Sequence, residues 1–419
     1  QAKEAFKSNC SGKKLLPKSF LTEQTLEKIT GVYDINSLNI RIPHDIKGLG
    51  GPIIEAMKAK NYYCGVLIYS PPGVGKTTLL KQKFPENDDC MWFYGDDLDT
   101  QQLFANITAT RLRNIIGRHT TVVIDEAQRI QDIGLRMKLI TDQMPDVRLV
   151  ATGSSAFELA NRLNEPLTGR KWEFRMFPIS FAEMVDHHGL QHELRMIPQR
   201  LVYGYYPEVV TSEGMVREVL KSLSDSYLYK DLFALGNIKK PEKLVLLLQA
   251  LAYQVGSQVS YNELANTVGI DAKTVETYVQ LLEKSYVIFR LPGFSRNLRN
   301  ELKNSRKIFF YDNGIRNALI SNFSRVEGRM DVGALWENFV VSERMKRNEY
   351  GRGWCNSYFW RTKDQSEIDY LEEIDGRLYA YEFKYNGKRK AKLPPSFEKA
   401  YPGSEFQEIT PDNIENFLL

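Results

Sequence analysis

The sequence contains few cysteines and no long apolar run. Its 4 cysteines are widely scattered and form no C-x-x-C pair, which favours a reduced compartment without a zinc ribbon. The longest apolar runs, 62–69 and 244–248, are far too short to span a bilayer, so we expect no membrane partner. No basic-then-apolar signal segment opens the chain. Together these absences predict a cytoplasmic protein.

A strong charge of one sign is also missing. The net charge of +4 is too small to identify a nucleic-acid partner, so basic patches must be sought locally. The hydrophobic share of 42% and the charged share of 26% are typical of a globular protein. A chain of 419 residues has room for about two to four domains, each with its own core.

A glycine-containing turn follows the apolar run 62–68 and precedes a helical pattern. Its glycines let backbone N–H groups point at a phosphate, and the helix start adds its positive dipole end. Lys76 would reach the β- and γ-phosphates, and the Thr77 hydroxyl would ligate Mg²⁺. Ser70 departs from the full pattern, which has glycine there. The predicted ATP-binding residues are Pro72, Gly73, Val74, Gly75, Lys76, Thr77 and Thr78.

Strands and helices alternate from residue 62 to about 184, which is typical of a parallel, doubly wound α/β sheet. After the turn we expect a strand at 90–94, a helical pattern over 100–116 and strands at 120–125 and 147–151. The strand at 120–125 ends in two carboxylates about fifty residues after the turn. Asp125 is expected to hold Mg²⁺ directly or through water, and Glu126 to polarise the attacking water.

Two further candidate catalytic residues follow the strand at 147–151. Ser154 would sense the γ-phosphate or align the water, or would instead cap the next helix. An arginine finger is expected among Arg162, Arg170 and Arg175, with Arg170 as our candidate. Arginines are also common on solvated faces, so composition alone does not choose between these roles.

Several motifs then occur in a fixed order. They are Ser-Pro-Pro-Gly-Val-Gly-Lys-Thr-Thr from residue 70, Val-Ile-Asp-Glu-Ala-Gln from 123, Ala-Thr-Gly-Ser-Ser from 151, Leu-Thr-Gly-Arg from 167 and Phe-Pro-Ile-Ser-Phe-Ala-Glu from 177. Together they resemble the AAA-type P-loop ATPases of bacteria and archaea that carry a C-terminal domain of unknown function. The resemblance covers nearly all the chain after residue 60. It implies an ATPase followed by a winged helix and a nuclease-like fold, without a settled biological role.

Residues 185–240 are expected to form a helical lid. The histidines at 187, 188 and 192 suggest a metal site, but no acidic or cysteine partner stands at ligand spacing, so an exposed loop is the favoured interpretation.

Residues 241–325 show the pattern of a winged helix: three helices, the last capped by Asp271, then strands at 287–291 and 307–311. The third helix is more acidic than basic, so any DNA contact is expected from the wing, through phosphates rather than bases. We favour this over a module that only contacts protein. The candidate DNA-binding residues are Arg290, Arg296, Arg299, Lys303, Arg306 and Lys307.

Residues 326–419 resemble the PD-(D/E)xK nucleases, because an Asp at one strand is followed by Glu-x-Lys on the next. Alternation places Glu382 and Lys384 on one face, where Asp369 can join them. Asp369 and Glu382 would hold Mg²⁺, Glu337 would add a ligand, and Lys384 would stabilise charge on the attacking water or phosphate. A solvated ion pair is the plainer alternative, and such folds can also lose their activity.

The sequence thus predicts an α/β protein with an AAA-type ATPase sheet, a helical lid, a winged helix and a small α/β nuclease-like domain. The expected boundaries are 1–45 for a lead-in, then 46–184, 185–240, 241–325 and 326–419. The leading hypothesis is an ATP- and Mg²⁺-dependent homo-oligomer that acts on DNA. The alternative is a nucleotide-dependent signalling or assembly switch whose C-terminal fold only recognises a partner.

Overall fold

The computed structural model describes residues 65–153, 167, 170–212, 214–226, 238, 240–295, 306–351, 353–362, 364–386 and 390–419. The expected lead-in over 1–45 lies outside these residues. Contacts divide the chain into two compact units, one joining 65–69 to 75–176 and the other joining 70–74 to 177–419. The first unit ends at Met176, earlier than the expected boundary at residue 184.

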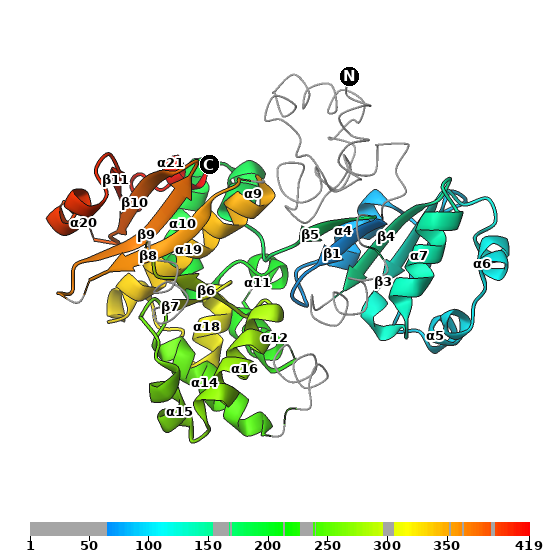
Figure 1. Cartoon of the computed structure of the whole chain (residues 1–419), viewed down its shortest axis with the longest axis horizontal. Helices are drawn as coiled ribbons and strands as arrows, with labels where there is room; N and C mark the ends of the chain where they lie inside the picture. Colours follow the sequence, from blue (N-terminus) through cyan, green and yellow to red (C-terminus); the bar gives the residue numbers. More distant parts are fainter. Residues whose placement is uncertain are drawn as a thin grey trace. The chain divides into compact units, whose positions relative to one another are not determined.

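A five-stranded sheet, of which Figure 1 labels β5, β1, β4 and β3, forms the centre of the first unit. Its strand order among the described residues is β2-β3-β4-β1-β5. All neighbouring strands are parallel, so their carboxyl ends meet at one edge of the sheet. β1 and β3 are buried along their whole length, as expected for strands covered on both faces. The predicted parallel α/β sheet is confirmed. Its strands are β1 (Gly65–Tyr69), β2 (Cys90–Tyr94), β3 (Thr121–Asp125), β4 (Arg148–Gly153) and β5 (Lys171–Arg175).

Helices connect these strands, beginning with α4 (Lys76–Lys83). The helical pattern expected over 100–116 forms two helices, α5 (Leu98–Ala105) and α6 (Ala109–Ile116). The break falls at Thr108, whose hydroxyl accepts the Arg111 N–H at 3.3 Å and so starts a new helix. α7 (Ile133–Gln143) then packs against β4.

The second unit begins with four helices: α9 (Phe181–His188), α10 (Leu190–Tyr203), α11 (Pro207–Thr211) and α12 (Val216–Ser226). α9 opens with a reciprocal capping box between Ser180 and Glu183. The Phe181 N–H donates to the Glu343 carboxylate at 2.7 Å, which fixes the start of α9 to a later helix. This bond links the start of α9 to a later part of the second unit.

Three further helices are followed by an antiparallel pair of strands. They are α14 (Pro241–Tyr253), α15 (Tyr261–Val268) and α16 (Ala272–Lys284), then β6 (Ile288–Pro292) and β7 (Arg306–Phe310). Ser260 and Asp271 cap α15 and α16 through the N–H groups of Glu263 and Thr274, as their sequence pattern indicates. A short helix, α18 (Asn313–Leu319), completes the segment.

A four-stranded sheet in the order β11-β10-β9-β8 forms the C-terminal part of the described chain. β8 (Asn356–Arg361), β9 (Glu367–Ile374) and β10 (Arg377–Phe383) are antiparallel, and β11 (Glu405–Ile409) joins β10 in parallel. The long helix α19 (Val332–Tyr350) precedes them, and α20 (Pro395–Ala400) and α21 (Glu415–Leu418) complete the fold.

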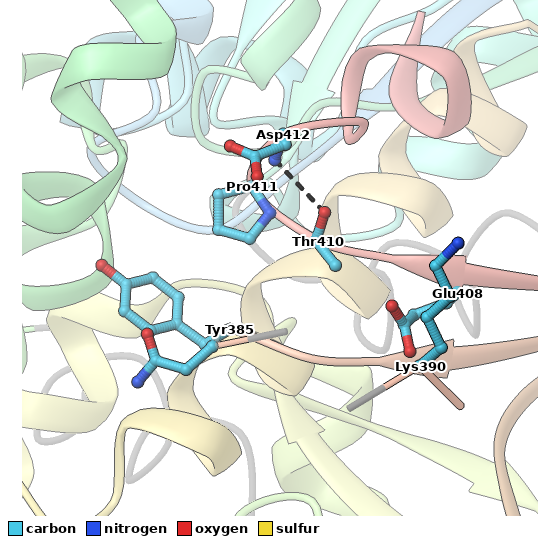
Figure 2. Close-up of a pocket in the computed structure, with 7 residues that line it drawn as sticks. Tyr385, Lys390, Glu408, Thr410, Pro411 and Asp412 are labelled. Carbon is cyan, nitrogen blue, oxygen red and sulfur yellow. Dashed lines mark hydrogen bonds between the residues drawn. The ribbon is translucent and has the colours of Figure 1, made fainter. Parts of the chain in front are cut away.

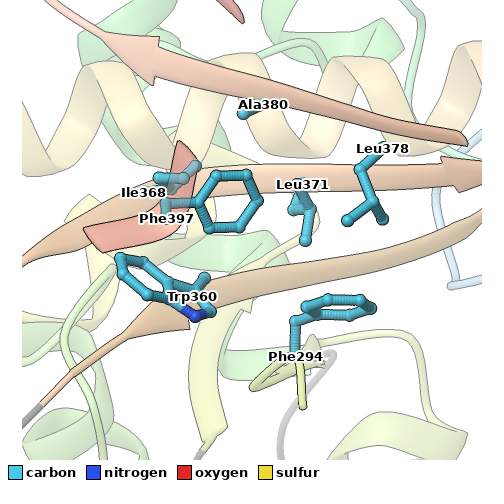
Figure 3. Close-up of a cluster of buried hydrophobic side chains, with 7 residues drawn as sticks. All are labelled: Phe294, Trp360, Ile368, Leu371, Leu378, Ala380 and Phe397. Atoms are coloured by element: carbon cyan, nitrogen blue, oxygen red, sulfur yellow. The ribbon is translucent and has the colours of Figure 1, made fainter. Parts of the chain in front are cut away.

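One hydrophobic core crosses the boundary expected at 325/326. Phe294, which follows β6, packs with buried side chains of β8, β9, β10 and α20 (Figure 3). Its N–H also donates to the Phe359 carbonyl at 2.7 Å. The hairpin β6–β7 and the C-terminal sheet therefore belong to one compact unit. The core residues beside Phe294 are Trp360, Ile368, Leu371, Leu378, Ala380 and Phe397.

No helix in the described ranges is long and apolar enough to cross a bilayer.

Candidate functional site

The turn between β1 and α4 has the backbone form that a phosphate-binding loop needs. Gly73 and Gly75 have φ of +75° and +93°, a region that side-chain-bearing residues rarely enter. Gly75 caps α4 without a side-chain cap bond, and the positive end of the helix dipole at this position favours an anion such as phosphate. Ser70, at the position where the pattern has glycine, is buried, and its hydroxyl donates to the Pro71 carbonyl at 2.6 Å. A serine is thus accommodated here by a bond within the loop.

Hydroxyl and carboxylate oxygens meet at the carboxyl edge of the sheet. The Thr77 hydroxyl donates to Asp125 Oδ2 at 2.8 Å, linking the start of α4 to the end of β3. The Thr152 hydroxyl, from β4, donates to Asp125 Oδ1 at 2.5 Å and accepts the Glu126 N–H at 3.0 Å. Sequence reasoning passed over Thr152, although it stands at the end of a strand that lies between β1 and β3.

Glu126 follows β3 in a strained backbone conformation. Its φ of 49° is in the left-handed region, which is uncommon for a residue other than glycine and typical of functional sites. Gln128 donates to Glu126 Oε2 at 2.5 Å, and Lys76 Nζ lies 3.8 Å from Glu126 Oε1. A Cβ at Gly95 would lie 2.2 Å from the Glu126 carbonyl oxygen, so only glycine allows β2 to end beside this carboxylate. Neighbouring groups therefore fix the position of Glu126.

The arginine candidates differ in their place on the sheet. Arg170 precedes β5, and its carbonyl accepts the N–H of Gly65, the first residue of β1. Because the strands are parallel, this is the edge opposite Lys76, and Arg170 pairs there with Asp142 at 3.0 Å. Within its own chain Arg170 therefore lies away from Lys76, and its role as an arginine finger stays a prediction. Arg175 instead stands opposite Tyr69 at the carboxyl edge. Ser154 and Arg162 lie outside the described residues.

The parallel sheet, the loop and the edge carboxylates define the class of P-loop ATPase domains. Residues 65–185 match the family described as an AAA domain, which covers this sheet. Residues 332–412 match a domain of unknown function, DUF4143, and residues 194–326 match another, DUF8612. Residues 18–90 also match the family described as sporulation stage III, protein AA. The chain thus combines an AAA ATPase domain with a C-terminal DUF4143 domain.

Its relatives resemble it over most of their length. An uncharacterised protein of Mycobacterium tuberculosis is 27% identical over 76% of this chain and 70% of its own. An uncharacterised protein of Haemophilus influenzae is 26% identical over 73% of this chain and 74% of its own. Among solved structures, a signal-transduction ATPase with a tetratricopeptide repeat sensor from Pyrococcus horikoshii covers 72% of this chain and 47% of its own at 11% identity. Its TM-score is 0.28, too low for an argument about function.

A second charged cluster lies in the C-terminal part of the chain. Lys307 of β7, only 2% exposed, places Nζ 2.8 Å from Glu337 Oε1 on α19 and 2.7 Å from Glu367 Oε1 on β9. The same Nζ is 4.0 Å from Asp369 Oδ1, and Asp369 Oδ2 accepts the Phe383 N–H at 2.9 Å. The structure thus brings Glu337 and Asp369 to Lys307, which the sequence analysis counted among the DNA-binding residues of the wing.

The other two predicted nuclease residues pair with each other, since Lys384 Nζ donates to Glu382 Oε1 at 2.7 Å. Asp369 and Glu382 lie on adjacent antiparallel strands, and burial raises the pKa of Glu382, with a further increase from the negative charge of Asp369. In the described ranges, no group of three or more His, Cys, Asp or Glu side chains is arranged to hold a metal ion.

Burial dominates the electrostatics of the cluster. It raises the pKa of Glu337 to about 8, against the opposing effect of Lys307, because a carboxylate removed from water is disfavoured. Burial also raises the pKa of Asp369, again opposed by Lys307. For Lys307 itself burial disfavours the charge, but Glu337, Asp369 and Glu367 outweigh it and raise the pKa. The ammonium is therefore firmly charged and held by its neighbours.

One of the candidate DNA contacts is corrected by these observations, and another is engaged by a partner. Lys307 is buried among carboxylates and cannot reach a phosphate from the wing. Arg290 makes a two-pronged ion pair with Glu283 at 2.9 and 2.5 Å, so its guanidinium is already engaged. Arg306 lies 4.2 Å over the ring of Tyr261. The remaining candidates, Arg296, Arg299 and Lys303, lie outside the described residues.

The histidines expected in an exposed loop lie on helices instead. His187 and His188 end α9, and His192 belongs to the first turn of α10. His188 Nε2 lies 2.6 Å from the buried Glu193, which also receives Arg200 and the Tyr205 hydroxyl. Burial lowers the pKa of His188 despite that carboxylate. These contacts give His188 a structural role at the α9–α10 corner, with an acidic partner that sequence spacing did not reveal.

A polar pocket of about 420 Å³ opens where the parallel strands β10 and β11 end (Figure 2). Within it the Asp412 N–H donates to the Thr410 hydroxyl at 3.3 Å. The pocket lies close in sequence to Lys384 but does not include it. Its lining residues are Tyr385, Asn386, Lys390, Glu408, Thr410, Pro411 and Asp412.

Proposed function

We propose that the chain binds and hydrolyses ATP at the carboxyl edge of the five-stranded sheet. The observation that carries this proposal is the Thr77–Asp125–Thr152 hydrogen-bonded chain beside Lys76 and Glu126. It unites the loop, the helix start and two strand ends at the edge where ligands bind in open α/β sheets. The AAA domain match over 65–185 supports the same assignment.

Each residue then has a distinct task. The loop N–H groups and Lys76 bind the phosphates, because the glycines allow the backbone to face an anion and the ammonium supplies charge. The hard oxygens of Thr77 and Asp125 fit Mg²⁺, whose bound charge would offset that of the phosphates. Glu126 orients and polarises the attacking water, while Thr152 positions both Asp125 and Glu126.

The test compares phosphate release by the full chain and by Lys76→Ala, with Lys81→Ala as the matched control on the same helix. Lys76→Ala should lower ATP turnover by about 10²–10³-fold, the usual cost of removing one electrostatic contact to the transition state. Lys81, in the last turn of α4, should be replaceable with little change. Equal turnover by the wild type and Lys76→Ala would contradict the proposal.

For the second unit we propose contact with DNA phosphates through the connection between β6 and β7. Three helices followed by an antiparallel hairpin are the layout of a winged helix, which favours this assignment. The connection carries Arg296, Arg299 and Lys303. ATP hydrolysis would alter how this module engages DNA. The same proposal includes a homo-oligomer in which a neighbouring subunit supplies an arginine to the ATP site.

DNA binding is tested by the salt dependence of affinity. The variant with Arg296, Arg299 and Lys303 replaced by Ala should bind more weakly. The slope of its log affinity against log salt concentration should be smaller by up to about three, because up to three phosphate contacts, and the counterions that they release, are lost. Arg377→Ala, at an exposed position on β10, is the control. The absence of DNA binding by the wild type at low salt would favour the alternative, a nucleotide-dependent assembly or signalling switch.

A further inference from the structure

The C-terminal cluster contains a cation of its own. Lys307 comes from β7 and reaches Glu337 on α19 and Glu367 on β9 at 2.8 and 2.7 Å, with Asp369 4.0 Å away. Three elements far apart in sequence thus converge on one ammonium group. At 2% exposure Lys307 is nearly removed from water, so these contacts replace its hydration.

The carboxylates that a PD-(D/E)xK site would offer to Mg²⁺ are already engaged. Glu337 binds Lys307, Asp369 accepts the Phe383 N–H and faces Lys307, and Glu382 binds Lys384. Glu367 also lies 3.6 Å from Arg361 Nε. Mg²⁺ needs several oxygens of suitable geometry directed at one point, and these carboxylate oxygens are directed at ammonium and N–H groups. The residues present therefore do not fit the magnesium ion that the nuclease resemblance implies.

We propose that Lys307 takes the place of a divalent cation in this cluster. Its ion pairs then hold the hairpin β6–β7 to the C-terminal sheet without a metal ion. The charges of the cluster support this assignment. The four carboxyl groups of Glu337, Glu367, Asp369 and Glu382 face the three cations Lys307, Lys384 and Arg361, so protein cations already occupy the cluster. The proposal concerns the second unit alone and does not depend on ATP hydrolysis.

The experiment measures Mn²⁺ binding by electron paramagnetic resonance on the nucleotide-free full chain. The proteins are the wild type, Asp369→Asn, Lys307→Met, the double variant Lys307→Met with Asp369→Asn, and Lys392→Met as an exposed-lysine control. We expect the same Mn²⁺ stoichiometry for the wild type and Asp369→Asn. Lys307→Met should gain one Mn²⁺ per chain, because the freed carboxylates then face each other, and the double variant should lose that gain.

Three results would overturn the proposal. One is a wild-type Mn²⁺ site that Asp369→Asn abolishes, which would make the cluster a metal site in spite of Lys307. Another is a folded Lys307→Met, checked by circular dichroism, that binds no more Mn²⁺ than the control. If Lys307→Met does not fold, the wild type and Asp369→Asn still decide the matter between them. The third is Mg²⁺-dependent DNA cleavage by the wild type that Asp369→Asn abolishes, because the cluster would then act with a metal ion.

Discussion

The nucleotide site and the C-terminal cluster use the same residue types in opposite ways. In the first, Lys76 stands 3.8 Å from Glu126 at the start of a helix whose N–H groups face a glycine-containing loop. In the second, Lys307 lies within 2.8 Å of two carboxylates and is nearly fully buried. Both lysines are buried, at 5% exposure for Lys76 and 2% for Lys307, so the difference lies in their surroundings: Lys76 opens a helix directly after a glycine-containing turn, whereas Lys307 lies among carboxylates of the fold. A lysine beside carboxylates therefore indicates a phosphate site only where a glycine-containing turn and a helix start accompany it.

The strongest test of this contrast is Glu126→Gln. The amide keeps the shape of the side chain but cannot polarise water, so ATP turnover should fall by about 10²–10⁴-fold. Binding of a fluorescent ATP analogue should be retained, because the loop and Lys76 are unchanged. Glu86→Gln, at an exposed position before β2, is the matched control. A variant that loses binding and turnover together would show that Glu126 supports the loop rather than the chemistry.

The next effect concerns Asp331, one carboxylate paired with two arginines, whereas in the C-terminal cluster one lysine is paired with several carboxylates. Burial acts against its charge, but Arg329 and Arg316 outweigh this and lower its pKa from 3.8 to about 2. The stabilisation is complete above the unfolded pKa of 3.8 and disappears as the pH falls through 2. Two pKa units correspond to about 2–3 kcal/mol. Urea unfolding at several pH values should show this loss in the wild type.

The control for that measurement is Asp331→Asn, which should be less stable near neutral pH and should lack the portion of acid sensitivity due to this group. Identical pH profiles for both proteins would show that the arginine pairs contribute nothing to folding. The result would sharpen the comparison between two carboxylates. Arginines lower the pKa of Asp331, whereas burial raises the pKa of Glu337 to about 8 in a cluster with more carboxylates than cations.

A smaller effect is expected at Thr152. Thr152→Val removes the hydroxyl that links Asp125 to the Glu126 N–H while keeping the shape, so turnover should fall by roughly ten-fold, the cost of about one hydrogen bond to a charged group. Thr152→Ser restores a hydroxyl and should recover most of the rate. Because Thr152 acts by positioning, kcat should change more than the KM for ATP. Failure of the serine variant to recover would indicate a packing role instead.

Much of the nucleotide site could be predicted because its signals are local. The loop and the strand ending in Asp125 and Glu126 carry their chemistry in consecutive residues, and the parallel sheet follows from the alternation of strands and helices. Arg170 could not be placed in this way. Its distance from Lys76 depends on the direction and register of β5 beside β1, which only the folded sheet reveals.

Only part of the C-terminal cluster could be predicted, because one of its members comes from a distant part of the sequence. Asp369 and Glu382 stand on adjacent strands and Lys384 directly follows the second of them, so alternation brings them near each other. Lys307 comes from a hairpin more than 50 residues earlier, and its basic neighbours made it resemble a surface charge. Its burial depends on the tertiary packing of β7 against α19 and the sheet, which no periodicity in the sequence encodes.

The insertion of Phe294 has a practical consequence for dissecting this protein. A fragment ending at residue 325 would expose an aromatic side chain that is 9% exposed in the intact fold, and one beginning at 326 would leave a gap in its core. Both pieces would offer apolar surface to other molecules and should aggregate. Expression of the second unit should instead begin near residue 177, which keeps Phe294 together with Trp360 and Phe397 and gives a fragment suited to crystallisation or hydrogen exchange.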